Sequence, residues 1–178
     1  EWSFNQLKDA ALHHLDFQIY LLDKNAVLID SSAYNIQFDG SKPVFIDVLS
    51  INQYKEGMYW YGHKQFCENF LNPLLLSSKK EIYFNNWFKG NLEGITTSDL
   101  NAMLSFTDKL SPSIFLQVYM LSKLDKKTIK SPNFSKKKLK GLKNFSKKSY
   151  LSLLKQLKKT ISNVEAYKRS RGGESYSR

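Results

Sequence analysis

The chain has 178 residues, of which 42% are hydrophobic and 14% aromatic, which is enough for one domain with a substantial core. No apolar run approaches the roughly 20 residues of a membrane-spanning helix. No signal peptide is visible, and the single cysteine, Cys67, argues against a disulfide-built secreted protein. These features predict a cytoplasmic location. The chain begins at Glu1 without a methionine, so we expect it to be a piece of a longer protein.

Positive charge is concentrated in the C-terminal third of the chain. Residues 121–178 carry 18 of the 27 Lys and Arg residues and only three of the 16 Asp and Glu residues. The formal net charge of +11 therefore describes a basic tail and not the whole chain. Clustered lysines can bind anionic polymers without sequence selectivity. Lysine outnumbers arginine here and no base-reading motif is present, which argues against nucleic acid as a partner.

A long helix is predicted near the N-terminus, from Ser3 to about residue 24. Ser3 is a good N-cap, Gln6 completes a capping box, and Trp2 with Leu7 can form a hydrophobic staple. Apolar residues then recur along one side of the helix, at Leu7, Ala11, Leu15, Ile19 and Leu22.

Residues 27–50 form the stretch around which we expect the rest of the chain to be organised. Two β-branched and aromatic runs, 36–38 and 44–46, flank the turn sequence Asp-Gly-Ser-Lys-Pro, and together they predict a β-hairpin. Three polar residues, Asp30, Asn35 and Asp47, stand at the ends of these elements with the spacing D-x4-N-x11-D. The short loop keeps the first two together, and the hairpin returns the third beside them.

This spacing resembles the catalytic loop and metal-binding aspartate of the protein-kinase-like fold, including its small-molecule phosphotransferase branch. The resemblance implies that Asp30 is the catalytic residue, acting on the acceptor hydroxyl. It implies that Asn35 and Asp47 bind Mg²⁺ and, through it, a nucleotide such as ATP. The residues alone leave one alternative open, an ordinary hairpin whose Asp and Asn side chains cap turns.

The histidines do not form an obvious site. His13 and His14 are consecutive, so their side chains point about 100° apart on a helix and cannot form a close pair. We expect both to be structural or solvated. His63 and Cys67 share a helix face, but two such residues without a further pair are weak support for zinc.

Successive helices are predicted after the hairpin. They cover residues 63–77, with a division or kink at Pro73, then 95–109 with a Thr or Ser cap, and then 111–124. The expected fold class is α+β and mostly helical, with a protein-kinase-like C-lobe and its catalytic-loop β-hairpin over residues 1–124. A basic, helical or disordered tail follows: a linker at 125–148, an amphipathic helix at 149–167 that packs weakly or not at all on the body, and a disordered end at 168–178.

Four segments together resemble a narrower group of proteins: EWSFNQLKDAAL, LIDSSAYNIQFDGSKPVFIDVLS, QFCENFLNPL and EGITTSDL. They are similar to the N-terminal region of bacterial S-adenosylmethionine-dependent methyltransferases of the nodulation-protein-like group, over roughly residues 1–120. The resemblance implies a methyltransferase domain downstream, after a basic linker. S-adenosylmethionine would bind only in that domain, because this chain has no Gly-rich strand-turn-helix loop.

Three functions remain open from the sequence. The favoured one is a kinase-like, Mg-nucleotide phosphotransferase-type module with a small-molecule or saccharide-type acceptor. The fragment by itself should be inactive, because no Gly-rich nucleotide loop or strand lysine precedes Asp30. The second is a non-catalytic accessory or regulatory module of an attached methyltransferase, favoured by Leu28 and Ser32 where kinases usually place His or Tyr and Lys. The third is binding of anionic polymers through the basic tail.

Overall fold

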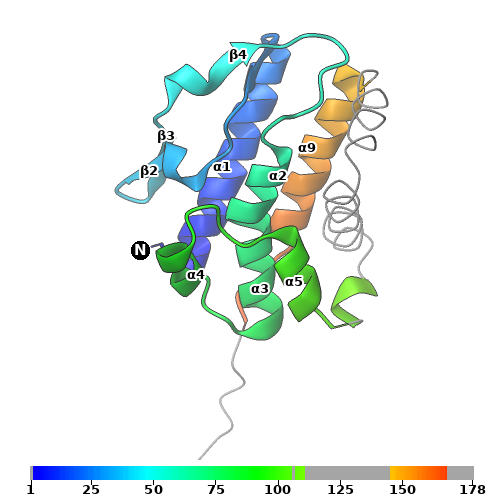
Figure 1. Cartoon of the computed structure of the whole chain (residues 1–178). Helices are drawn as coiled ribbons and strands as arrows, with labels where there is room; N and C mark the ends of the chain where they lie inside the picture. The colour runs from blue at the N-terminus through cyan, green and yellow to red at the C-terminus, as the bar shows by residue number, and fades with distance from the viewer. Residues whose placement is uncertain (1, 106, 111–144, 168–178) are drawn as a thin grey trace, which may run out of the picture.

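The computed structural model describes residues 2–105, 107–110 and 145–167 (Figure 1). The predicted helix at 111–124, most of the predicted linker and the predicted disordered end lie outside these residues. None of the helices in the described ranges has the length and apolar character needed to cross a membrane. The helices and strands are α1 (Phe4–Asp23), β1 (Ala26–Leu28), β2 (Ile36–Asp39), β3 (Lys42–Phe45), β4 (Ile51–Gln53), α2 (His63–Phe66), α3 (Asn72–Lys80), α4 (Asn85–Gly90), α5 (Thr97–Met103) and α9 (Lys147–Ser162).

Helix α1 begins as the sequence predicts. The Ser3 side chain accepts a hydrogen bond from the Gln6 amide at 3.2 Å, and the Gln6 side chain accepts one from the Ser3 amide at 2.8 Å, which is a complete capping box. The helix ends at Asp23. Its buried face is wider than the predicted stripe and includes two polar residues, His14 and Gln18.

Two small antiparallel sheets follow α1, so the fold class is α+β. Strand β1 pairs with β4, with Leu28 opposite Ile51. Between them, β2 and β3 form the predicted hairpin, with Ile36 opposite Phe45. The amide of Ile29 also donates to the Ser50 carbonyl at 3.0 Å. The segment 29–50, which contains the hairpin and its loops, therefore leaves the β1–β4 sheet and returns to it, and its two ends are hydrogen-bonded to each other.

The helix predicted at 63–77 is present but changes its hydrogen-bond pattern before Pro73. Helix α2 passes into a π-helical stretch, Cys67–Leu71, and then into α3, which has the proline in its first turn. Proline has no N–H, and its ring crowds the carbonyl four residues earlier. A π-helical turn just before the proline accommodates that conflict without ending the helix.

Helix α5 is shorter than the predicted helix at 95–109. The Thr96 side chain accepts from the Asp99 amide at 3.1 Å and caps the N-terminus, as expected. The helix ends at Met103, because the backbone of Leu104 turns to an extended conformation. A separate 3-10 turn, Thr107–Leu110, follows.

Helix α9 packs along α1 (Figure 1), so the prediction of a weakly packed or free helix at 149–167 is wrong. The helix spans Lys147–Ser162, and its apolar stripe is fully buried in the same core as α1: Tyr150, Leu154, Leu157 and Ile161. The lysines that suggested a solvated element lie between these positions. The charge run thus occupies the outer side of a core helix.

Polar contacts fix α9 against α1 as well. The Gln18 side-chain amide donates to the Tyr150 hydroxyl at 2.7 Å, and its oxygen accepts from the Leu28 amide at 2.8 Å. The Lys8 ammonium donates to the carbonyls of Ser162 and Val164, both at 2.8 Å. A cation at this place satisfies carbonyls that the end of a helix leaves without intrahelical partners.

Truncating the α9 stripe should destabilise the whole domain. Leu154→Ala removes a side chain with 0% exposure and should cost about 2–5 kcal/mol in the free energy of unfolding. Lys155→Ala, at an exposed position of the same helix, should change it by less than about 0.5 kcal/mol. Urea denaturation of both variants measures the difference. Equal stabilities would contradict a shared α1–α9 core.

Candidate functional site

The three predicted site residues lie in the segment 29–50, and backbone hydrogen bonds bring the parts of this segment that carry them close together. The Ile46 amide donates to the Asn35 carbonyl at 2.9 Å, so Asn35 lies across from the residue that precedes Asp47. Asp30 directly follows Ile29, which is hydrogen-bonded to Ser50. The D-x4-N-x11-D spacing thus corresponds to neighbouring backbone segments at the base of the β2–β3 hairpin.

Each of the two carboxylates caps a turn with one of its oxygens. Asp30 Oδ1 accepts from the Ser32 amide at 2.8 Å, and Asp47 Oδ1 accepts from the Leu49 amide at 3.1 Å. Within the described residues, the second oxygen of each carboxylate makes no hydrogen bond or ion pair. The capping alternative is therefore observed for the two aspartates, and each carboxylate still has one oxygen available for a ligand.

Asn35 has an unused polar group at the same place. Its side-chain Nδ2 is buried and has no hydrogen-bond partner among the described residues. A buried amide group without a partner is costly. The amide of Asn35 is therefore a further group at the hairpin base that a ligand could satisfy.

Two amide side chains of the continuous helix that runs from α2 through the π-helical stretch to α3 hold the loop between Asp30 and Asn35. Gln65 Oε1 accepts from the Ser31 amide at 2.8 Å, and Asn69 Oδ1 accepts from the Ala33 amide at 3.1 Å. Asn69 Nδ2 also donates to the Glu93 carbonyl at 3.1 Å. The helix thereby fixes the loop on one side and the segment before α5 on the other.

These positioning residues were not predicted from the sequence, although a signal for them exists. Gln65, Asn69 and Asn72 recur at i, i+4 and i+7 in an otherwise apolar helical segment. Such a polar stripe within a buried run indicates groups that bond to backbone. Asn72 fits the pattern, because its Nδ2 donates to the Ile95 carbonyl at 2.8 Å.

His14 is enclosed by aromatic rings, which confirms the expected structural role. Its ring centroid lies 5.4–6.2 Å from those of Phe45, Trp60, Phe66 and Phe70. Burial, with a smaller effect from the charge of His13, lowers the pKa of His14 to about 3. Neither ring nitrogen has a partner among the described residues. His14 is therefore neutral at physiological pH and packs as an apolar ring.

His63 and Cys67 are both buried, and His63 Nδ1 is hydrogen-bonded with the Tyr59 hydroxyl. In the ranges that the structure covers, no three His, Cys, Asp or Glu side chains gather in a group that could hold a metal ion. A cation at the hairpin base would thus rely on one carboxylate, that of Asp47, on the amide of Asn35 and on ligands from outside the protein.

Comparison with known proteins gives one similarity. The chain is 51% identical to Nodulation protein NoeA of Rhizobium meliloti (strain 1021) over 124 residues, which are 70% of this chain and 26% of the relative. The chain thus spans about a quarter of the length of that curated relative. No family model matches the chain, and no solved structure matches it.

Proposed function

We propose that the chain contains a kinase-like, phosphotransferase-type module whose site lies at the base of the β2–β3 hairpin. The observation that carries this proposal is the hydrogen-bonded segment 29–50. Within it, Asp30, Asn35 and Asp47 come from backbone stretches that are hydrogen-bonded to one another. A helix, a catalytic loop, a hairpin and a second aspartate follow one another in this order in such a site, which also uses a Gly-rich nucleotide loop and a strand lysine that the described residues do not supply.

The donor set suits a magnesium ion. Mg²⁺ prefers hard oxygen ligands and usually completes its shell with water and phosphate oxygens. The unoccupied carboxylate oxygen of Asp47 and the amide oxygen of Asn35 are ligands of this kind. Bound there, Mg²⁺ would neutralise negative charge on a nucleotide phosphate. Asp30 would orient the acceptor hydroxyl and accept its proton at the oxygen that does not cap the turn.

The similarity to a longer relative extends the proposal. That relative is named a nodulation protein, and the matched residues are 26% of its length. We propose that the module belongs to a longer, nodulation-associated protein with an attached methyltransferase domain. S-adenosylmethionine would bind in that domain and not at the hairpin base.

A second function, a non-catalytic accessory module, is favoured by the two caps. Because Asp30 and Asp47 each bond to a backbone amide two residues on, local structure alone gives a reason for both residues. In that case their charge would have no role. The two functions therefore differ in whether the charge of Asp47 is needed.

Asp47→Asn separates these functions. Asparagine also caps turns and 3-10 starts, so the variant keeps the local structure and removes the charge. Titration of the chain with Mn²⁺, alone and with ATP, followed by electron paramagnetic resonance, should show binding. We expect the variant to bind at least about tenfold more weakly, because a charge-assisted contact contributes roughly 1.5–3 kcal/mol.

The matched control is Asp39→Asn. Asp39 is exposed and pairs with Lys42 at the turn end of the hairpin, several residues away from Asn35. Its variant should bind Mn²⁺ as the parent does. Asp30→Asn should also retain most of the binding, because its proposed contact is with the acceptor. Binding that is absent from the parent or unchanged by Asp47→Asn would contradict the metal site and favour the accessory module.

A further inference from the structure

A polar pocket of about 230 Å³ lies beside the loop that follows Asp30. This volume is near the lower end of the range of small-molecule sites, so it suits a ligand with a single ring. Asp30 Oδ1 accepts a hydrogen bond from the Ser32 amide at 2.8 Å, so the pocket borders the turn that the Asp30 carboxylate caps. The loop, the continuous helix and the segment before α5 line the pocket with two residues each: Ser32, Tyr34, Gln65, Asn69, Leu92 and Glu93.

The loop and the helix supply hydrogen-bond donors to the pocket. Gln65 Oε1 accepts from the Ser31 amide at 2.8 Å, so the Nε2 group of Gln65 is the end of the side chain that is left over. No described residue accepts a hydrogen bond from it. The Ser32 hydroxyl oxygen accepts from the Tyr34 amide at 3.2 Å, and its own hydrogen has no acceptor in the described part of the chain. A ligand can therefore receive hydrogen bonds from both groups.

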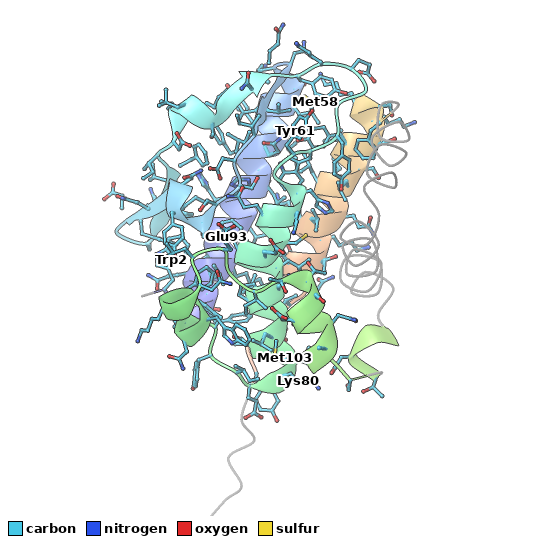
Figure 2. The ribbon with its side chains drawn as sticks, viewed as in Figure 1. Trp2, Met58, Tyr61, Lys80, Glu93 and Met103 are labelled. Carbon is cyan, nitrogen blue, oxygen red and sulfur yellow. The ribbon has the colours of Figure 1, made fainter. Side chains whose placement is uncertain are left out.

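Glu93 supplies an acceptor on the other side of the pocket (Figure 2). Its backbone amide donates to Asn91 Oδ1 at 3.0 Å, and its carbonyl accepts from Asn69 Nδ2 at 3.1 Å. The exposed carboxylate makes no hydrogen bond or ion pair with any residue that the structure describes. Because the backbone of Glu93 is held on both sides, binding at its carboxylate requires little reordering of the chain.

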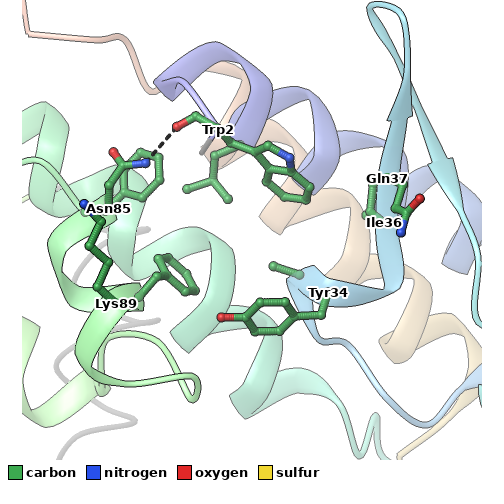
Figure 3. Close-up of a pocket in the computed structure, with 10 residues that line it drawn as sticks. Trp2, Tyr34, Ile36, Gln37, Asn85 and Lys89 are labelled. Carbon is green, nitrogen blue, oxygen red and sulfur yellow. Dashed lines mark hydrogen bonds between the residues drawn. The ribbon is translucent and has the colours of Figure 1, made fainter.

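Two exposed apolar side chains complete the lining. Tyr34 is 52% exposed and Leu92 is 69% exposed. Tyr34 also lines a separate, mostly apolar cavity of about 380 Å³, and Figure 3 shows it across that cavity from Trp2. The ring of Tyr34 is an apolar surface against which the C–H groups of a ligand can pack. The polar pocket therefore suits a compound that has polar groups at its edge and an apolar face.

Hydroxyl groups fit the polar part of the pocket best. A hydroxyl both donates and accepts, so it can donate to Glu93 and accept from Gln65 Nε2 or the Ser32 hydroxyl. An ammonium group has no acceptor and would leave these two donors without a partner. A carboxylate or a phosphate has acceptors but would be repelled by the charge of Glu93. The pocket therefore selects neutral hydroxyl groups on a small ring.

We propose that this pocket binds a neutral, polyhydroxylated ring of the monosaccharide type. Its hydroxyls lie between Glu93 and Gln65, and its C–H face packs on Tyr34. The binding needs no metal. The role of the pocket as the acceptor subsite rests on the proposed phosphotransferase function. In that reaction a ligand hydroxyl oxygen bonds to the terminal phosphorus of ATP, its proton passes to Asp30, and ADP leaves.

A titration of the ¹⁵N-labelled full chain, followed by the NMR signal of the Gln65 side-chain amide, tests the binding without metal. The probes are methyl β-D-glucopyranoside, the anionic methyl β-D-glucopyranosiduronate, and cyclohexylmethylammonium, which has a charge and no hydroxyl. We expect saturable shifts with the glucoside. The uronate should bind about threefold to tenfold more weakly, because its carboxylate is repelled by Glu93. The ammonium probe should also bind more weakly than the glucoside.

Two pairs of variants test the contacts with the ring and with the charge. Tyr34→Ala should raise the Kd of the glucoside about threefold to tenfold, whereas Tyr34→Phe should leave it nearly unchanged because the ring remains. Tyr20→Ala, at a position of α1 with 58% exposure, is the control. Glu93→Gln should remove the preference for the glucoside over the uronate. Its control is Glu81→Gln, at an exposed residue after α3.

Several results would overturn the proposal: no saturable binding of the glucoside, tightest binding of the ammonium probe, or equal effects of Tyr34→Ala and Tyr20→Ala. An unchanged preference in Glu93→Gln would overturn the contact with Glu93. Circular dichroism checks that the variants stay folded. The Mn²⁺ titration separates this proposal from the proposed function. Binding of the glucoside without Mn²⁺ binding supports the pocket and overturns its role as acceptor subsite, and the reverse overturns the pocket alone.

Discussion

Replacing His14 by leucine is expected to stabilise the fold and to remove a large part of its sensitivity to acid. The pKa of His14 falls from 6.5 to about 3 on burial, so the folded state holds the neutral ring while the unfolded chain takes up a proton below pH 6.5. Stability from this group is fully present above pH 6.5 and is lost as the pH falls toward 3. The loss is about 1.4 kcal/mol per pH unit, so it amounts to several kcal/mol over that window.

At neutral pH, His14→Leu should already stabilise the fold by about 1–3 kcal/mol, because it removes two buried nitrogens that have no partner among the described residues. Urea denaturation of the parent and the variant at several pH values between 4 and 7.5 measures both effects. The difference between the two should grow as the pH falls. His13→Gln, on the same helix, should leave most of the pH dependence in place. Parallel curves for parent and His14→Leu would contradict the buried neutral ring.

Gly94→Ala should be strongly destabilising. Gly94 has a φ of +81°, and a Cβ there would lie 2.3 Å from the Glu68 carbonyl oxygen, which is backbone and cannot move aside cheaply. The same oxygen accepts a hydrogen bond from the Ile95 amide at 2.9 Å. The strain and the clash together should cost about 2–5 kcal/mol in the free energy of unfolding.

Gly40→Ala is the matched control for the backbone conformation alone. Gly40 has a φ of +59°, but a Cβ there would have nothing within 4 Å. Its substitution should therefore cost only about 1–2 kcal/mol. Thermal or urea unfolding of both variants compares the two positions. If Gly94→Ala costs no more than Gly40→Ala, the close approach to Glu68 is not part of the folded state.

The substitution of Gly94 should also affect the candidate site. The carbonyl of Glu93 accepts from Asn69 Nδ2, and the other side of the same amide holds the Ala33 backbone. A shift of the segment before α5 therefore pulls on a side chain that positions the loop between Asp30 and Asn35. Weaker Mn²⁺ binding in Gly94→Ala than in Gly40→Ala would reveal that link.

Local features of this fold could be predicted from the sequence, because their partners are only a few residues apart. The capping box of Ser3 and Gln6, the hairpin turn at Gly40 and the cap at Thr96 depend on neighbouring residues. The backbone arrangement of the candidate site could be predicted for the same reason. Loop and hairpin lengths alone place Asn35 beside the residue before Asp47. A metal and a nucleotide at that place remain predictions.

Long-range features could not be predicted in this way. Gln65 and Asn69 bond to backbone 34 and 36 residues away, and no local pattern names those partners. Helix α9 was misjudged for a different reason. Its lysines suggested a solvated element. Its apolar stripe, which begins at Tyr150, is nevertheless buried against α1, a helix that is far away in the sequence. The enclosure of His14 likewise depends on rings from three other parts of the chain.

The pairing of α1 with α9 has a consequence for biosynthesis. Gln18 and Tyr150 are hydrogen-bonded across 132 residues, and Lys8 reaches the Ser162 carbonyl across 154. During translation, the first helix leaves the ribosome long before the helix that covers it, and its apolar face stays exposed meanwhile. Contacts of such sequence separation form late and slowly. A nascent chain stalled before residue 150 should therefore remain sensitive to protease and bind chaperones, and protection should begin only after α9 has emerged.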